Sequence, residues 1–214
     1  MKRVFFVSVV AMGLMFSVNV NAQGNLGGVL NSVLGGSSSS SSSSGDDLVS
    51  ALTSVFSSDK QAKASNIIGT WNYSEPAIVF TSNNILTKAA AKIAANKVES
   101  KLQSYLTNYG IAPGSFSMTF KEDGTFTETL KGHTTKGTWE ISDSKLKLKI
   151  ASVAAISITT QIDGKDMQFV TDATKLLTLF KTIGASSSNT SLKTITSLMN
   201  SVNGMQAGIT LRKQ

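Results

Sequence analysis

Few residues in this chain have the types and the spacing that catalysis or metal binding requires. The one histidine, His133, lies between Gly132 and Thr134, and the chain contains no cysteine. A zinc site would therefore need carboxylates as its other protein ligands, which is uncommon. A Ser-His-Asp triad would have to use the same histidine, and no serine lies in a nucleophile-elbow pattern. We interpret His133 as an exposed turn residue and expect no catalytic residue, no metal site, no cofactor and no enzymatic activity.

One carboxylate has an unusual position. Glu128 has the same strand parity as Phe126 and Leu130, so a regular strand would place it on the apolar face. A buried lone carboxylate is costly unless it is paired. Two interpretations stay open. A bulge or an edge position turns Glu128 outward, which we favour, or the side chain is a polar anchor for a ligand in the interior.

Aromatic and methionine side chains form the expected interior. In a small barrel such residues either fill the core or line a pocket for an apolar ligand. Short strands and three helices leave limited interior volume, which favours a filled core for most of the set. The interior set comprises Trp71, Tyr73, Phe116, Met118, Phe120, Trp139, Met167 and Phe169. The candidate ligand-binding residues are Trp71, Tyr73, Phe116, Met118, Phe126, Glu128, Trp139 and Phe169.

The elements that position these residues are mostly strands. Apolar and polar residues alternate four times between Ser115 and Ile150, which predicts four strands. Turn-forming residues separate them, including Asp123-Gly124, and indicate antiparallel hairpins. A further hairpin is predicted at residues 154–162 and 166–171. The stretch is therefore an antiparallel meander.

Both ends of the chain add strands. Residues 67–73 and 77–80 predict two short strands, separated by a turn at Ser74-Glu75-Pro76 whose proline prevents pairing inside a sheet. The last strand is predicted from Ala207 to Arg212. About nine strands, nearly all antiparallel neighbours, predict a closed up-and-down barrel, because closure removes the exposed sheet edges. A sandwich with helices outside is the alternative. The fold class is thus mainly β with helical insertions.

Three helices interrupt the strands. Apolar residues recur with a helical period from Asn84 to Asn108, and we assign Ile93, Val98 and Leu102 to the buried face. This long helix is predicted to close one end of the barrel or to lie along its wall. Two shorter amphipathic helices are predicted within residues 172–184 and 192–204.

The N-terminus indicates export. Residues 1–22 have a basic start, a largely apolar core and a small-residue cleavage site before Gln23. The apolar core is shorter than the ~20 residues that a transmembrane anchor needs. No cysteine follows the cleavage site, so lipid attachment of the bacterial lipoprotein kind is excluded. The location expected is periplasmic or secreted.

Residues 23–65 are predicted to form a tail and residues 66–214 the domain. The tail contains eight consecutive serines, Ser37 to Ser44, a composition typical of a flexible spacer. Weakly amphipathic pieces flank the serines, so residues 23–64 either dock on the domain, on a partner protein or weakly on a membrane surface, or have no specific role. Scattered lysines supply most of the net charge of +7, so we interpret them as solvated surface and expect no nucleic-acid partner.

Several segments carry a family resemblance. They are GTWNYSEPAIVFTSNNIL with its Gly69-Thr70-Trp71 motif, KVESKL, FKEDGTF, DATKLL and NGMQAGITL. Together, over residues 66–212, they resemble a family of exported lipocalin-like domains of unknown function from Gram-negative anaerobic bacteria. The resemblance implies a lipocalin-like barrel and an exported location, and it carries no established catalytic or ligand-binding residues.

The resemblance also suggests one structural pair. In lipocalins an arginine near the end of the barrel packs across the Gly-x-Trp tryptophan, so Arg212 would stack on Trp71. The alternative is that Arg212 is a solvated terminal residue, because it alternates away from Ile209 and Leu211.

Two functions fit these features. An exported barrel with an apolar interior and no catalytic constellation favours a binding module for a small hydrophobic molecule. The alternative is a non-catalytic structural or protein-interaction module of the cell envelope, which uses the amphipathic tail or a helix surface. Neither the ligand nor the oligomeric state follows from the sequence.

Overall fold

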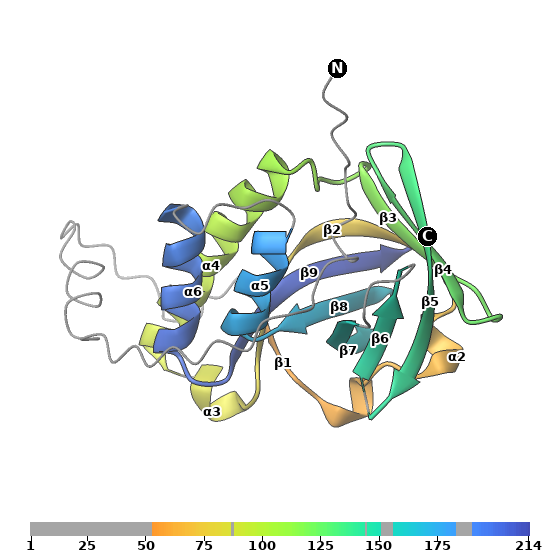
Figure 1. Cartoon of the computed structure of the whole chain (residues 1–214). Helices are drawn as coiled ribbons and strands as arrows, with labels where there is room; N and C mark the ends of the chain where they lie inside the picture. Colours follow the sequence, from red (N-terminus) through yellow and green to blue (C-terminus); the bar gives the residue numbers. More distant parts are fainter. Residues whose placement is uncertain (1–52, 87, 144, 151–155, 183–189) are drawn as a thin grey trace, which may run out of the picture.

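The computed structural model describes residues 53–86, 88–143, 145–150, 156–182 and 190–214. This part of the chain is mainly β, with nine strands in one sheet and helices gathered beside it (Figure 1). The predicted signal peptide and the serine run lie outside the described residues. The strands are β1 (Thr53–Val55), β2 (Gly69–Phe80), β3 (Phe116–Phe120), β4 (Thr125–Leu130), β5 (His133–Ser142), β6 (Lys145–Lys149), β7 (Ile156–Asp163), β8 (Asp166–Thr171) and β9 (Met205–Lys213).

The sheet closes on itself. Strands β2 to β9 pair in sequence order, and β2 pairs in addition with β9, so these strands form a ring. All pairs within the ring are antiparallel, whereas β1 runs parallel to β2. The expected closed, mainly β fold with antiparallel neighbours is confirmed. Closure gives the chain one inner face, where alternate residues of each strand meet.

Strand β2 corrects the prediction of two short strands. It continues from Gly69 to Phe80, and a register shift between Tyr73 and Glu75 marks a bulge in place of the expected turn. Pro76 pairs with β9 on one side only, because the pairing with β3 ends at Asn72 and that with β1 begins at Ile78. A proline is tolerated at such a one-sided position, since no second neighbour needs its missing N–H.

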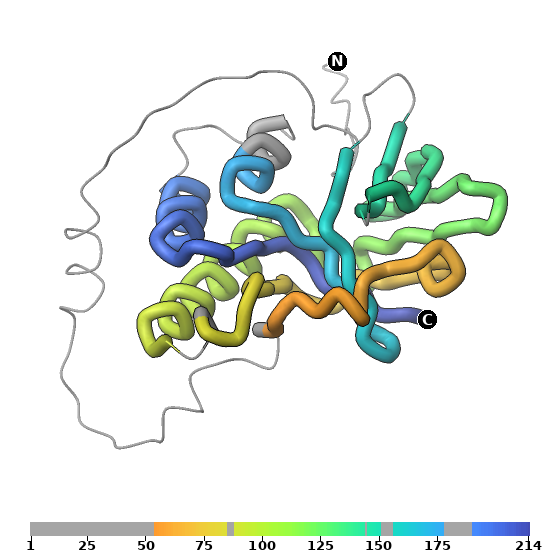
Figure 2. The backbone as a smooth tube through the Cα atoms, turned by 90° about the horizontal axis from the view of Figure 1, so that it is seen from below, coloured from red at the N-terminus to blue at the C-terminus, as the bar shows by residue number. Residues whose placement is uncertain are grey.

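The N-terminal strap (Thr53–Ala62) joins the sheet upstream of residue 66, where the domain was predicted to begin. Besides the β1–β2 pairing, the strap places Phe56 against a small cluster of Ala77, Val79 and Val170 on the outer face of the ring. The backbone N–H of Phe56 donates to the Phe80 carbonyl at 2.8 Å. Figure 2 shows this orange segment lying along the ring.

A polar contact fixes the middle of the strap. The Gln161 side chain on β7 is only 4% exposed, and its Nε2 donates to Ser54 Oγ at 3.1 Å and to Gln168 Oε1 at 2.6 Å. The backbone N–H of Ser57 donates to Gln161 Oε1 at 3.2 Å. The backbone N–H of Ala62 donates to the Thr160 carbonyl at 3.1 Å. Buried amides that are satisfied in this way hold a segment in one position.

Helices α3 to α6 lie together on one side of the ring, whereas α2 lies on the opposite side (Figure 1). None of the helices in the described ranges is long and apolar enough to cross a membrane. A turn of helix, α2, precedes β2, and α3 follows it. The long helix α4 contacts β2 and α6, and α5 contacts α6 and β9. The helices are η1 (Ser58–Lys60), α2 (Ala64–Ile67), α3 (Asn83–Leu86), α4 (Ala89–Asn108), α5 (Ala173–Thr182) and α6 (Thr190–Ser201).

The buried face of α4 differs from the predicted one. Val98 and Leu102 are buried as expected, but Ile93 is half-buried. Five residues separate Ile93 from Val98, which places them about 140° apart around a helix. The buried face consists of Ala91, Ala94, Ala95, Val98, Leu102, Tyr105 and Leu106.

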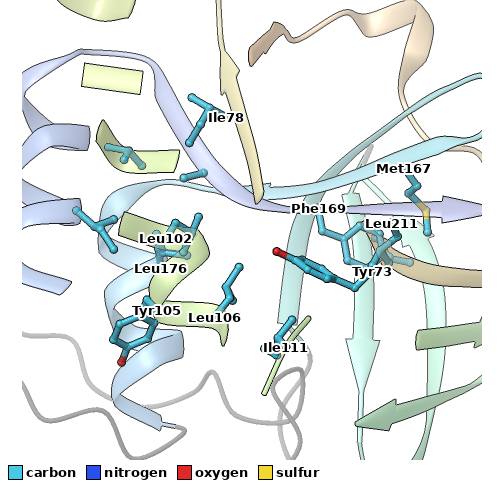
Figure 3. Packing of buried hydrophobic residues seen from close by; sticks show 14 of the residues in the cluster. Tyr73, Ile78, Leu102, Tyr105, Leu106, Ile111, Met167, Phe169, Leu176 and Leu211 are labelled. Atoms are coloured by element: carbon cyan, nitrogen blue, oxygen red, sulfur yellow. The ribbon is translucent and has the colours of Figure 1, made fainter. Parts of the chain in front are cut away.

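One hydrophobic core joins the helices to the ring. Tyr73 of β2, Ile111 after α4 and Phe169 of β8 belong to the same buried cluster as Leu102 and Leu176 of the helical layer. Figure 3 shows Tyr73 between the helical side chains and the ring residues Phe169, Met167 and Leu211. The helices therefore cover the end of the interior on which Tyr73 lies.

We predict that the strap is needed for full stability. A chain that begins at Ser65 should unfold about 10 °C below a chain that begins at Asp46, because it loses β1, the cover over Val79 and the contacts of Gln161, worth about 3–5 kcal/mol together. Thermal unfolding followed by circular dichroism measures the difference. As a control, Lys60→Ala should change the melting temperature little, because its ion pair with Asp163 is exposed. Equal melting temperatures for the two chains would contradict the role of the strap.

Candidate functional site

The candidate site is the interior of the ring. The structure brings all the predicted binding residues into one buried cluster or directly beside it, and none of them is more than 8% exposed. Their exposed fractions are 0% for Trp71, 2% for Tyr73, 2% for Phe116, 0% for Met118, 0% for Phe126, 1% for Glu128, 8% for Trp139 and 5% for Phe169.

Aromatic rings fill one part of this interior. The Phe120 ring lies at the centre, 5.8 Å from the ring centroids of both Phe126 and Trp139 and 6.3 Å from that of Phe169. The contacts with Trp139 and Phe169 are edge-on, a favourable geometry for aromatic pairs. The Trp139 Nε1–H donates to the Lys121 carbonyl at 3.0 Å. These residues form packed core rather than a pocket wall.

A glycine makes this packing possible. Gly137 lies opposite Phe126 on the neighbouring strand, and a Cβ at Gly137 would be 2.6 Å from the Phe126 ring. It would also lie 2.3 Å from the Lys149 carbonyl oxygen. The second Gly-Thr-Trp sequence, at residues 137–139, therefore has a packing role, in which the glycine admits a ring across the strand and the tryptophan packs beside it.

The first Gly-Thr-Trp sequence closes the α2 end of the ring. Trp71 is fully buried, and its Nε1–H donates to the Ile67 carbonyl of α2 at 2.7 Å. Ile67 is itself 0% exposed, so α2 acts as a cover over this end. Sequence reasoning assigned Ile67 to a strand and missed this cover.

Lys213, and not Arg212, lies over Trp71. The Lys213 Nζ is 5.1 Å from the centroid of the indole, within cation–π range. The pairing register of β2 and β9 explains why Lys213, and not the predicted Arg212, lies there. Trp71 pairs with Lys213 across β2 and β9, whereas Arg212 pairs with Asn72 and has the opposite strand parity. Gly69 leaves room for this lysine, because a Cβ there would be 3.0 Å from Lys213 Cε.

Arg212 makes a different contact. Its Nε donates to Asp166 Oδ1 at 2.8 Å and its Nη2 to Oδ2 at 3.1 Å, in a bidentate pair on the outer face of β8 and β9. Asp166 raises the pKa of the Arg212 guanidinium through these hydrogen bonds and its charge. The expected stacking of Arg212 on Trp71 is therefore wrong, although the expected neighbourhood of the first and last ring strands is confirmed.

The lysine contact gives a second prediction. Lys213→Met, which keeps an apolar chain over Gly69 and Trp71 but removes the ammonium, should lower the free energy of unfolding by about 0.5–1 kcal/mol. Lys213→Ala should cost more, because the cover over the indole is lost as well. Urea unfolding followed by tryptophan fluorescence compares the two variants. No loss for Lys213→Met together with a loss for Lys213→Ala would assign the whole effect to the chain and contradict a contribution from the charge.

Tyr73 connects the interior to the helical layer. Its hydroxyl donates to Gln103 Oε1 of α4 at 3.2 Å. Burial raises the pKa of Tyr73 from its ordinary value of 10.0 to about 12. The free energy of unfolding should therefore fall as the pH rises above 10 toward 12, since the folded chain holds this proton more tightly than the unfolded chain.

Glu128 lies on the inner face. Strand β4 keeps a regular register with β3 and β5, in which Glu128 pairs with Met118 on one side and with Thr135 on the other. Its exposed fraction is 1%. The favoured interpretation, a bulge or an edge that turns the side chain outward, is therefore wrong.

His133 opens β5 and is exposed. Within the described ranges, no group of three or more His, Cys, Asp or Glu side chains is placed to hold a metal ion. Besides the Ile67 cover, two structural contacts were not predicted from the sequence. Lys213 could have been found from its shared parity with Leu211. The burial of Gln161 has no signal in the sequence, because a segment about a hundred residues earlier causes it.

Comparison with known proteins assigns this chain to a family. The model of a lipocalin-like domain family, DUF4923, matches residues 41–213. The match begins upstream of the strap, in agreement with the strap being part of the domain. No curated protein matches the chain. Among solved structures, a DUF4847 family protein from Bacteroides vulgatus is similar at 16% identity over 69% of this chain and 95% of that one, with a TM-score of 0.33. The chain belongs to the DUF4923 family of lipocalin-like domains.

Proposed function

We propose that this protein is an exported binding module for a small hydrophobic molecule. The observation that carries the proposal is the interior itself, a closed ring of strands whose inner face is apolar and aromatic except for a few polar residues such as Glu128. Lipocalin-like rings of this size can enclose one small ligand. Export rests on the basic and apolar residues of positions 1–22 and on the cleavage pattern before Gln23.

The interior is not uniformly sealed. Leu130, Ile156 and Ile158 have the inner-face parity of their strands and pack against the core, yet they remain partly exposed. The aromatic part around Phe120 is tightly packed by comparison. A ligand would therefore enter beside the partly exposed residues and stop at the aromatic rings.

Analysis of the protein purified from its own host tests the proposal. Native mass spectrometry followed by organic extraction should recover a stoichiometric apolar molecule. Leu130→Trp should fill the entry and reduce the fraction of protein that carries the ligand. Lys136→Trp, at an exposed position of β5, is the matched control and should leave this fraction unchanged. Ligand-free protein from the host, together with failure to take up any apolar probe, would contradict the proposal.

A second function is favoured by the packed aromatic rings. If the interior is filled throughout, the domain would serve as a structural or protein-interaction module of the cell envelope, with the tail or a helix surface as its contact. A defined partner recovered with ligand-free protein, and lost when residues 23–52 are removed, would support this function over ligand binding.

A further inference from the structure

We propose that Glu128 selects the ligand of this interior, and that the ligand carries a protonated amine at the end of an apolar body. This inference rests on the proposed binding function and adds to it the chemical class of the molecule.

The position of Glu128 supports this role. It lies in a row of paired residues that crosses the ring from Trp71 through Met118 and Glu128 to Thr135. Solvent exposure rises along this row. Trp71 and Met118 are 0% exposed, Glu128 is 1% exposed and Thr135 is half-buried. The carboxyl group therefore lies on the inner face, one strand from a residue that solvent reaches.

The inner-face neighbours of Glu128 along β4 explain why a ligand would reach this carboxyl group. Phe126 precedes it by two residues on β4 and belongs to the packed aromatic rings. Leu130 follows it by two residues and is partly exposed. Glu128 thus lies at the boundary between packed core and the partly exposed apolar residues, where a ligand that enters past Leu130 would end.

The charge of the side chain indicates the ligand chemistry. An ammonium ion next to a carboxylate of low exposure gains charge-assisted hydrogen bonds, which are about twice as strong as neutral ones. A fatty acid would bring a second negative charge to the same place and would be repelled. The apolar body of the ligand would lie against Leu130, Ile156 and Ile158, which supply affinity without discrimination between head groups.

Glu128 differs in this respect from every other acidic residue of the β4–β6 region. Glu140 on β5 points to the outer face with its side chain 68% exposed, near Lys147. Glu122 and Asp123 lie exposed in the turn before β4, and Asp143 lies exposed in the turn after β5. Only Glu128 among these five is placed to meet a ligand inside the ring, and Glu140 provides a matched control.

Three probes with the same chain length test the proposal, namely dodecylamine, dodecanol and dodecanoate, each below its micelle concentration. Binding to the full chain without its signal peptide is measured by native mass spectrometry and by tryptophan fluorescence. Dodecylamine should bind at least about tenfold more tightly than dodecanoate. Glu128→Gln should abolish this preference while it keeps dodecanol binding, and Glu140→Gln should leave all three affinities unchanged.

The outcomes separate the two proposals. If dodecanoate binds as tightly as dodecylamine to the wild-type chain, the selectivity inference is overturned while the binding function stands. A preference that survives Glu128→Gln would likewise overturn it. If none of the probes binds, the binding function fails and the inference fails with it. Equal or reversed affinities of the wild-type chain for dodecylamine and dodecanoate overturn the inference even if Glu128→Gln does not fold.

Discussion

Gly208→Ala is expected to lower the free energy of unfolding by more than about 4 kcal/mol and to leave much of the chain unfolded. A Cβ at this position would lie 1.9 Å from the Phe169 carbonyl oxygen, 2.9 Å from the Phe169 carbonyl carbon and 3.0 Å from the Val170 Cα. All three are backbone atoms of β8, so no side chain can rotate away to make room. The two strands would have to separate at a pairing that the ring needs for closure.

The position of Gly208 makes this separation costly. Gly208 pairs with Val170 on one side and with Ala77 of β2 on the other, so displacement of β9 disturbs two strand pairs at once. It would also disturb the outer cluster of Ala77, Val79 and Val170 that Phe56 covers. The absence of a side chain at one residue therefore permits both ring closure and docking of the strap.

Gly164→Ala is the control for this prediction. Gly164 has a φ of +58° in the turn between β7 and β8, and nothing lies within 4 Å of the position of its Cβ. Its replacement should cost only the strain of the left-handed conformation, about 1 kcal/mol. Urea unfolding, followed by circular dichroism, compares the two variants. Similar losses for both would show that the close approach to Phe169 is relieved by a small shift.

The strands were predictable from local patterns. Each run between Ser115 and Ile150 alternates with period two, and the glycine and aspartate residues at its breaks set the hairpins, so the buried identities of Phe116, Met118 and Phe120 follow directly. Ring closure followed from the number of antiparallel neighbours. The continuous strand β2 could not be predicted in this way. A bulge and pairing on one side only accommodate Pro76 in a strand that proline would otherwise interrupt.

The site was predictable in composition but not in detail. The inner-face residues were identified, whereas Arg212 was chosen over Lys213 by analogy, although the alternation along β9 assigns Lys213 to the side of Trp71. Glu128 was expected to turn outward because its burial is costly, yet the strand register overrides the preference of a single side chain. The strap was missed because its buried contact, Gln161, depends on residues far away in the sequence.

Leu102→Asp is expected to cost about 4–5 kcal/mol of the free energy of unfolding, the second of the two largest effects. Leu102 is 1% exposed on the face of α4 that belongs to the common core. The substitution removes a buried aliphatic side chain and places a carboxylate among apolar neighbours. Because α4 contacts both α6 and β2, the damage should spread through the helical layer to the ring.

Ile93→Asp on the same helix is the matched comparison. Ile93 is half-buried and lies away from the face of Val98 and Leu102, so its aspartate can reach water and should cost only about 1–2 kcal/mol. The two variants introduce the same charge into the same helix, and therefore burial is the main contribution to their difference, beside the smaller benefit of an aspartate near the helix N-terminus at Ile93. Urea unfolding followed by circular dichroism gives both free energies of unfolding. A loss for Ile93→Asp equal to that for Leu102→Asp would mean that the Ile93 side of α4 is covered in the folded protein, and it would restore the face first expected from the sequence.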